Sequence, residues 1–386
     1  MASNNISTNR VTNNYLNNEY LKLYNTFNKI CSSSSSSSSN CLDITSIMNV
    51  FKLLYYGMDS ENQKRISKVK QMIDLTPKSM YSKSGVFIRP GLKFNPKYKN
   101  VFEDKHLLLD VLPTRQKHIT SINLKINAKF TKDNIKQDFL TPGKTISPEC
   151  MLFIKDQSLF KAKWQDQFDK DKTVPNTEFY IDNNDNFVYV DMMKTPEPGE
   201  YFTYYHKQLN SLFLSLPYAN NSYKMLIIMP NNVHTKSELL DMLKCKISAM
   251  DIINFYYKNG SDKNYVSLNL PKFEFKSEWR LDSKSDIINN IDDYESEYLS
   301  HFVNPNMNLS NMCKNMTKIE AIEFISSSNV VNNEEGTSVT TETDIFVYDG
   351  YIPNLNPPLI INKNFIFIIL NKENIIMKIG VYTPTN

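Results

Sequence analysis

Residue types that commonly perform catalysis or bind metals are present in this 386-residue chain, but none is spaced for either task. No two histidines have the His-x-x-x-His spacing of a metal site, and the cysteines form no Cys-x-x-Cys pair. The chain has no Gly-x-Ser-x-Gly elbow, P-loop or dinucleotide fingerprint. Acidic pairs such as Asp292-Asp293 are typical of solvated surface. We therefore predict that the protein is not an enzyme and uses no metal or other cofactor; only a triad assembled in space would escape this search.

The segment 332–358 is the part of the sequence that is hardest to explain as ordinary secondary structure. It reads NNEEGTSVTTETDIFVYDGYIPNLNPP and follows an apolar strand candidate, Ile322–Val331. Asp349-Gly350 between two short apolar runs is a strong signal for a hairpin with a type I′ turn, and alone the pattern favours that interpretation. A long surface loop is the second interpretation, although loops of this length are uncommon unless they are functional. The residues by themselves leave both open.

Composition predicts a globular protein without a nucleic-acid partner. Hydrophobic residues make up 41% of the chain, enough for a large core, and the net charge of +3 is not gathered in a basic stripe. Five cysteines, an odd number without paired spacing, favour free thiols in a reducing compartment. The polar N-terminus lacks a signal-peptide core, and no apolar run approaches 18 residues. We expect a soluble monomer in the cytoplasm that does not contact membranes.

The elements that must position residues 332–358 are helices first and strands afterwards. Residues 1–18 are interpreted as a polar tail, Tyr20–Ile30 as a helix, and the serine run 32–39 as a flexible loop insertion. Residues 44–56, ending at Gly57, have the pattern of a buried helix. Strands are predicted at 151–160, 179–193, 212–217, 224–229, 265–275, 320–331, 365–370 and 375–382, with helices at 236–246 and 283–291. This order predicts one α+β domain over residues 19–386.

An ordered set of landmarks resembles the serpin family. Glu334-Glu335-Gly336-Thr337 resembles the serpin hinge, and Phe160-Lys161-Ala162-Lys163-Trp164, followed by Phe168-Asp169 and Thr173, is similar to the segment called the breach. Further similar sequences are Met192-Met193, Leu216-Pro217-Tyr218, Met229-Pro230-Asn231, Leu270-Pro271-Lys272-Phe273 and Gly380-x-Tyr382-x-Pro384. Each landmark is weak alone. Their common order from about residue 20 to the C-terminus is highly specific.

Other details resemble the poxvirus caspase-inhibitor serpins, the cytokine response modifier group. They are Leu54-Tyr55-Tyr56-Gly57, Ser147-Pro148-Glu149-Cys150, Leu309-Ser310-Asn311-Met312-Cys313 and a short stretch between Ile73 and Gly85 where most serpins carry an extra helix. The resemblance implies helices packed on three β-sheets, with a large central sheet. It also implies that residues 334–358 are a hinge and an exposed reactive-centre loop. The expected function is a suicide-substrate protease inhibitor that blocks host apoptosis or inflammation from the host-cell cytoplasm.

An inhibitor of this kind is cleaved in its loop and then inserts the freed segment into the central sheet as a new strand. From Thr337 onward, alternate residues are uncharged and β-branched: Thr337, Val339, Thr341 and Thr343. The intervening residues up to Glu342 carry the only charge, so the first set is suited to the inner face. No proline interrupts Glu334–Ile352, so every backbone donor can pair. The segment is competent to insert.

The expected cleaved bond is Asp349–Gly350. Counting from Glu334 with the commonest serpin spacing would place Gly350 before the cut, whereas the shorter loop of the poxvirus inhibitors selects Asp349. Caspase pockets are built around basic side chains that bind a carboxylate. Phe346, Val347, Tyr348 and Asp349 are therefore the expected specificity residues, and a host caspase the expected partner. An Asp-directed serine protease of the granzyme type requires the same carboxylate and is the competing partner.

Below the insertion site, serpins usually carry a Ser, an Asn and a His, the shutter. Here the resemblance places Asp43, Asp156 and Ser326 in that region, with Ser46 retained and Trp164 in the breach. Two acids there need partners or raised pKa values. Such changes would slow insertion, so a non-inhibitory serpin acting as a binding or decoy module is the second alternative.

Overall fold

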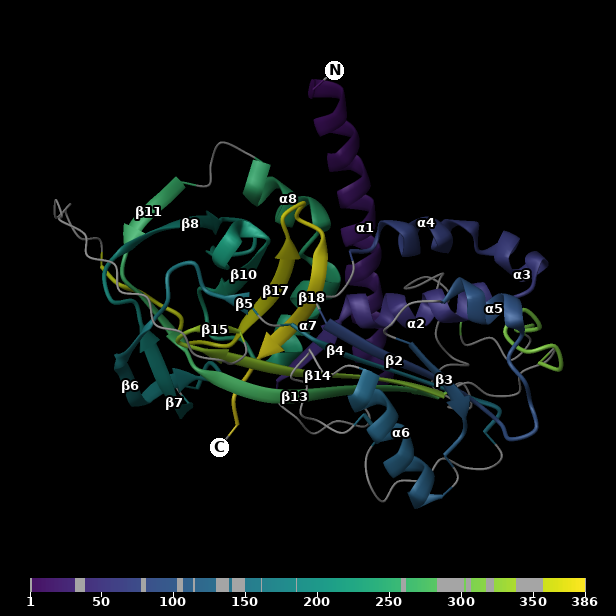
Figure 1. Ribbon diagram of the computed structural model, residues 1–386. Helices are drawn as coiled ribbons and strands as arrows, with labels where there is room; N and C mark the ends of the chain where they lie inside the picture. Colours follow the sequence, from purple (N-terminus) through teal and green to yellow (C-terminus); the bar gives the residue numbers. More distant parts are fainter. Residues whose placement is uncertain are drawn as a thin grey trace.

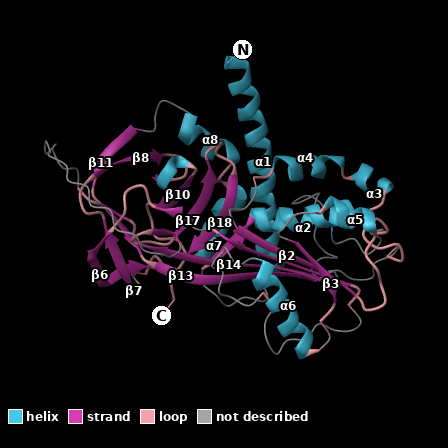
Figure 2. Cartoon of the chain, in the orientation of Figure 1, coloured by secondary structure: helices cyan, strands magenta, loops and turns pink. Residues whose placement is uncertain are grey.

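The computed structural model describes most of the chain as helices packed on three sheets (Figure 1). The described residues are 2–31, 39–77, 81–102, 107–113, 115–129, 139–140, 150–160, 162–184, 186–257, 262–282, 302, 307–316, 323–337 and 357–385. The helices are α1 (Ala2–Cys31), α2 (Ile44–Gly57), α3 (Ser60–Arg65), α4 (Ser67–Leu75), α5 (Pro96–Val101), α6 (Gln116–Lys129), α7 (Lys236–Cys245) and α8 (Ala249–Tyr257). Figure 2 shows helices packed against the sheets, with α1 to α5 grouped at one side, in agreement with the predicted α+β class.

The central sheet has the order β3-β2-β4-β14-β15-β5, with β13 paired to β14. Its strands are β2 (Tyr81–Ile88), β3 (Leu107–Val111), β4 (Leu152–Leu159), β5 (Ala162–Lys163), β13 (Phe273–Asp282), β14 (Glu323–Asn333) and β15 (Gly336–Thr337). In β14, residues 326, 328, 330 and 332 are buried. Because side chains alternate along a strand, these residues mark the inner face of the central sheet.

The second sheet has the order β1-β18-β17-β10-β9-β8-β11. Its strands are β1 (Asn40–Asp43), β8 (Gly199–His206), β9 (Ser211–Pro217), β10 (Tyr223–Pro230), β11 (Asp262–Val266), β17 (Phe365–Asn371) and β18 (Ile376–Tyr382). All residues of β17 and β18 are buried, because this sheet is covered on both faces.

The small sheet has the order β16-β12-β7-β6. Its strands are β6 (Asp169–Tyr180), β7 (Phe187–Lys194), β12 (Leu268–Pro271) and β16 (Leu359–Ile360). Val188, Val190 and Met192 of β7 are buried, whereas Phe187, Tyr189 and Asp191 are exposed. This alternation belongs to a sheet with one face on the core.

Helix α2 lies between the central and second sheets and contacts β4, β14 and β18. Asp43 caps its N-terminus by accepting a hydrogen bond from the Ser46 backbone N–H at 3.1 Å. Most of its residues are buried, among them Ile47, Phe51 and Leu54, so the helix fixes the distance between the two sheets. No helix among the described residues is long and apolar enough to cross a membrane.

Two predictions about the N-terminal part differ from the structure. The segment 1–18, predicted as a polar tail, is helical from Ala2 onward. Asn13 and Asn17 donate side-chain hydrogen bonds to the carbonyl oxygens of Glu373 and Asn374 at 2.6 and 2.9 Å. Ser39, predicted as the end of the flexible serine run, is buried and exchanges hydrogen bonds with the Thr383 backbone. The rest of that run and the predicted helix at 283–291 lie outside the described residues.

Candidate functional site

Strand β15 is a two-residue strand held between β14 and β5. Thr337 is the register partner of Asn332 on one side and of Ala162 on the other, and Gly336 is the partner of Asn333 and Lys163. Both pairings are antiparallel. Glu334 and Glu335 form the turn that joins β14 to β15. Of the four residues Glu334–Thr337, which we call the hinge, Gly336 and Thr337 therefore already lie in the central sheet.

Below β15 the central sheet is closed. Residues Glu323–Ser327 of β14 pair directly with Phe153–Gln157 of β4 in a parallel ladder. A strand that continued from Thr337 in the direction of β15 would have to separate β4 from β14. The sheet thus has an opening at one end, where β15 lies between β14 and β5. Beneath it is the parallel β4–β14 ladder, which we call the seam.

Gly336 fills a position that no other residue could occupy without strain. Its φ is +152°, and a Cβ atom there would lie 2.2 Å from the Ala162 carbonyl oxygen and 2.5 Å from the Lys163 Cα. Both contacts are with backbone, which cannot move aside as a flexible side chain does. The glycine lets the chain turn from β14 into β15 against β5.

The two glutamates of the hinge are fastened to neighbouring strands. The Phe168 and Trp164 backbone N–H groups donate to the Glu334 and Glu335 carbonyl oxygens, both at 2.9 Å. The buried Glu334 carboxylate accepts hydrogen bonds from Thr173 Oγ1 at 2.9 Å and Lys272 Nζ at 3.2 Å. Burial alone would raise the pKa of Glu334, but its hydrogen bonds and Lys272 lower it overall. Lys170 Nζ lies 2.5 Å from Glu335 Oε1.

Trp164 and Tyr218 form the inner wall of the opening. Their rings stack with centroids 4.4 Å apart and an interplanar angle of 8°. Trp164 Nε1 donates to the Asn333 carbonyl oxygen at 3.0 Å, and the Tyr218 and Thr337 hydroxyl oxygens lie 2.8 Å apart. The Thr337 side chain therefore points to the inner face, as predicted from the alternation.

Farther along the seam, Ser46, Ser84, Asp156 and Ser326 form what we call the shutter cluster. Ser84 Oγ donates to Asp156 Oδ1 at 2.5 Å, and Ser326 Oγ donates to Ser46 Oγ at 3.1 Å. Asp156 is fully buried, and its Oδ2 has no hydrogen-bond partner. Burial raises the pKa of Asp156 to about 7, against the opposing effect of its hydroxyl partners.

The second acid of this region, Asp43, is ion-paired. Lys378 Nζ and Ser158 Oγ both contact Asp43 Oδ2, and Thr45 Oγ1 donates to Oδ1 at 2.6 Å. Burial by itself would raise the pKa of Asp43, but Lys378 and the hydroxyl donors lower it overall. The predicted requirement that two acids here need a partner or a raised pKa is met in both ways. The sequence pattern did not indicate Lys378, because it lies 335 residues away.

The remaining predicted site residues lie outside the described part of the chain. They are the insertion residues Val339, Thr341 and Thr343, the specificity residues Phe346, Val347 and Tyr348, and the bond Asp349–Gly350. Their roles stay predictions. The structure brings together the others, Ser46, Asp156, Trp164, Ser326 and Glu334–Thr337, along one seam of the central sheet.

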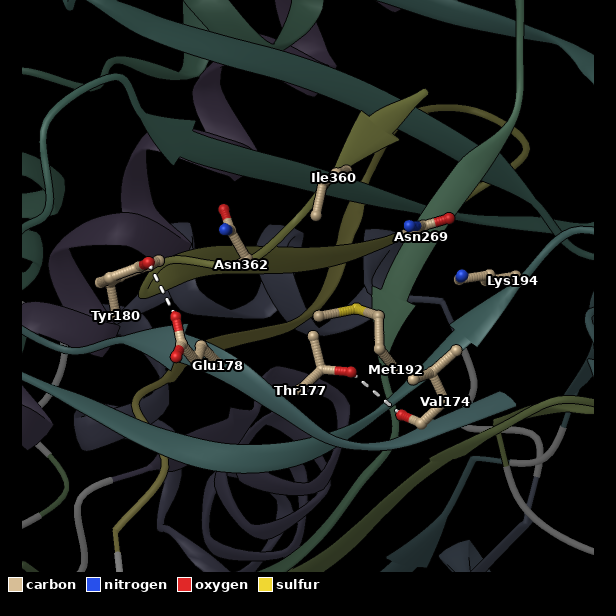
Figure 3. Close-up of a pocket in the computed structure, with 9 residues that line it drawn as sticks. All are labelled: Val174, Thr177, Glu178, Tyr180, Met192, Lys194, Asn269, Ile360 and Asn362. Carbon is tan, nitrogen blue, oxygen red and sulfur yellow. Dashed lines mark hydrogen bonds between the residues drawn. The ribbon is translucent and has the colours of Figure 1, made fainter. Parts of the chain in front are cut away.

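A cavity of about 390 Å³ lies on the small sheet, beside the segment that follows residues 338–356. Figure 3 shows Thr177, Met192 and Ile360 among its lining residues, with Glu178 and Lys194 also facing it. Tyr180 Oη donates to Glu178 Oε2 at 3.1 Å. Among the described residues no group of His, Cys, Asp or Glu could hold a metal ion.

Comparison with known proteins places these features in a family context. A family model described as "Serpin (serine protease inhibitor)" matches residues 34–384. The chain is 24% identical over 353 residues to serine proteinase inhibitor 2 of vaccinia virus, covering 88% of this chain and 93% of that protein. It is 25% identical over 273 residues to human Serpin B13, covering 71% of this chain and 64% of that protein. The structure of human glycosylated kallistatin superimposes with a TM-score of 0.72 at 16% identity, over 97% of this chain and 98% of that one.

Proposed function

The chain belongs to the serpin family, the serine protease inhibitors, and from that premise we propose that it is a suicide-substrate inhibitor of caspase-type cysteine proteases, cleaved after Asp349. The observation that carries the proposal is β15. Gly336 and Thr337 of the hinge are already paired on both edges, between β14 and β5, in the antiparallel direction that an inserting strand must take. Only the seam between β4 and β14 has to open for the strand to lengthen.

The register of β15 gives the path of insertion. Continued without a bulge, it would bring residue 339 opposite Val330, residue 341 opposite Ser328 and residue 343 opposite Ser326. On the other edge the same residues would face Phe160, Ser158 and Asp156. Because they share the parity of Thr337, the side chains of Val339, Thr341 and Thr343 would all enter the inner face.

Insertion is expected to be strongly favourable. It separates the parallel ladder of Glu323–Ser327 with Phe153–Gln157 but lets a strand of about a dozen residues pair on both edges. At a net ~1 kcal/mol for each new hydrogen bond, the gain is on the order of 10 kcal/mol. The uncleaved fold is then metastable and is maintained by the barrier to opening the seam.

The chemistry needs only the protease's own groups. Its cysteine thiolate attacks the Asp349 carbonyl carbon and forms a thioester, while the bond to the Gly350 nitrogen breaks. The new amine leaves with a proton from the protease's general acid. Insertion then carries the attached protease along the sheet and distorts its active site. Loss of one oxyanion-hole donor alone slows catalysis by ~10²–10³, enough to stall hydrolysis of the thioester.

The caspase assignment rests on Asp349 and its neighbours. An aspartate before the cut meets the requirement of a basic pocket, and glycine after it is easily accommodated. Phe346, a large aromatic, stands at the fourth position back. The vaccinia virus relative covers nearly the same length and supports a viral setting. Action on a caspase would place the protein in the cytoplasm of a host cell.

Titration of an inflammatory caspase with the wild type and with Asp349→Ala tests this assignment. We expect a covalent complex with the wild type, loss of inhibition in Asp349→Ala, and normal inhibition by Asp344→Ala, a matched control in the same segment. Unchanged inhibition by Asp349→Ala would eliminate the assignment. If granzyme is trapped and the caspase is not, the serine-protease alternative holds; cleavage of both without complex identifies a non-inhibitory serpin.

A further inference from the structure

A second cavity, of about 350 Å³, lies on the second sheet where α8 ends. Figure 1 shows α8 beside β8 and β10, at the end of the molecule that also carries β11. The cavity is lined by Gln165, Glu200, Phe202, Ser215, Pro217, Asn221, Tyr223, Lys224, Tyr256, Lys263 and Lys372. Its volume is within the range of cavities that bind small molecules.

The strand register places the lining side chains on one face. Lys224 is the partner of Pro217, Ser215 the partner of Phe202, and Phe202 the partner of Lys263. Directly paired residues point to the same side of a sheet, and Ser215 and Pro217 are two apart in β9. Lys224, Ser215, Phe202 and Lys263 therefore project side by side across four neighbouring strands. This is the face that α8 covers through Phe255 and Tyr256.

Three aromatic side chains give the cavity apolar walls. They are Tyr223 and Tyr256, which are partly buried, and Phe202, which is exposed. The Tyr256 hydroxyl donates to Ser215 Oγ at 3.1 Å, and its ring packs against Phe255 with centroids 4.7 Å apart. The Tyr256 ring is thus held in place, with the Lys224 ammonium over one of its faces.

The charges in the cavity are unbalanced. Lys263 Nζ is paired with Glu200 at 3.0 Å, and Lys372 Nζ lies 3.5 Å from Glu373 Oε1. Lys224 has no carboxylate partner among the described residues, and its Nζ lies 3.8 Å from the centroid of the Tyr256 ring. Burial without a counter-ion lowers the pKa of Lys224 to about 8.

We propose that this cavity binds a small organic anion with a flat apolar body, in which the anionic group pairs with the Lys224 ammonium and the body packs against Tyr256 and Phe202. An anion relieves the unpaired charge, and the net charge of the lining repels cations. A neutral ring would gain the apolar contacts alone and leave the Lys224 ammonium with no anionic partner among the described residues. The site does not involve residues 338–356, so it is independent of protease inhibition.

Binding of 2-naphthoate, measured by calorimetry at pH 7, tests the proposal, with 2-naphthamide as the neutral match. The wild type should bind the carboxylate at least tenfold more tightly than the amide. Lys224→Met, which keeps the length of the side chain and removes its charge, should abolish that preference. Lys246→Met, which removes an exposed lysine outside the cavity, should retain it.

Further measurements distinguish loss of the binding site from loss of the fold. A thermal melt establishes that Lys224→Met is folded, and Tyr256→Leu should weaken both ligands because it removes the flat surface. Asp349→Ala should bind as the wild type does, whether or not the protein inhibits a caspase. Equal affinity of the wild type for carboxylate and amide, or an unchanged preference in folded Lys224→Met, would overturn the proposal. So would the absence of binding at millimolar 2-naphthoate.

Discussion

Ser326 lies directly opposite Asp156 in the parallel ladder that joins β14 to β4. Both side chains are buried on the inner face, and each is hydrogen-bonded to a different serine, Ser46 for Ser326 and Ser84 for Asp156. No hydrogen bond joins the pair itself in this part of the structure. The seam at this level is held by backbone pairing, whereas Ser84 joins Asp156 to β2 and Ser46 joins Ser326 to α2. It can therefore open without breaking a direct side-chain bond between the strands.

Thr337→Arg should convert the inhibitor into a substrate. Thr337 is only 2% exposed and faces Tyr218, so an arginine there would place an unpaired charge in the opening at a cost of several kcal/mol. The hinge should then stay outside the sheet after cleavage. Gel analysis of protease mixtures should show cleaved inhibitor in place of complex.

Thr337→Val is the matched control. It keeps the β-branched shape and loses one hydrogen bond, worth about 1 kcal/mol. It should still form complex. Equal amounts of complex with Thr337→Arg and Thr337→Val would mean that the hinge residue does not enter the sheet.

Asp156→Asn should remove a pH dependence of stability. The pKa of Asp156 is about 7 in the native state and about 3.9 in an unfolded chain, so between these values the native state binds more protons. Its contribution to the free energy of unfolding therefore falls as pH rises, by up to ~4 kcal/mol from pH 4 to pH 8. Melting temperatures at pH 5 and pH 8 should differ less in Asp156→Asn than in the wild type.

Asp43, the acid of the neighbouring ion pair, does not change the stability between pH 5 and pH 8. The pKa of Asp43 is lowered, so its stabilising contribution is present above about pH 4 and is lost only as pH falls further. Asp171→Asn, which removes an exposed carboxylate, should keep the wild-type pH dependence. If the melting temperature of Asp156→Asn changes with pH as much as that of the wild type, the pH dependence belongs to another group.

A disulfide across the seam should lock the inhibitor. Gln157 and Ser327 are register partners of β4 and β14, and Gln157→Cys with Ser327→Cys would join the strands that must separate. The oxidised variant should be cleaved without trapping the protease, and a reductant should restore the complex. The pair Glu274→Cys and Val331→Cys joins β13 to β14, which move together, and should inhibit in both redox states. Full inhibition by the oxidised seam variant would exclude separation of β4 from β14.

Features with a local cause were predictable from the sequence. The alternation in β7 and the uniformly apolar run of β17 are visible as residue patterns, since each follows from how many faces of the strand are covered. The inward direction of Thr337 followed from the same alternation. The ordered landmarks assigned Asp156 and Ser326 to the shutter and Trp164 to the breach; in the structure Ser326 lies opposite Asp156, and Trp164 bonds to Asn333 beside the hinge.

Features that depend on distant partners could not be predicted. Residues 1–18 look like a polar tail, yet Asn13 and Asn17 bind backbone carbonyl groups near residue 374. Lys378 as the partner of Asp43, and the unpaired Lys224 beside Tyr256, appear only once the second sheet is assembled. The pairing of β15 on both edges involves two residues, too few to leave a periodic pattern.

The most direct test of the account is thermal unfolding of the protein before and after a single cut at Asp349–Gly350. If the cut segment inserts between β4 and β14, a gain on the order of 10 kcal/mol should raise the melting temperature by about 10 °C or more. The oxidised Gln157→Cys/Ser327→Cys variant should not gain in the same way. A cut wild-type protein that melts at the temperature of the intact one would contradict insertion, and with it the inhibitor mechanism.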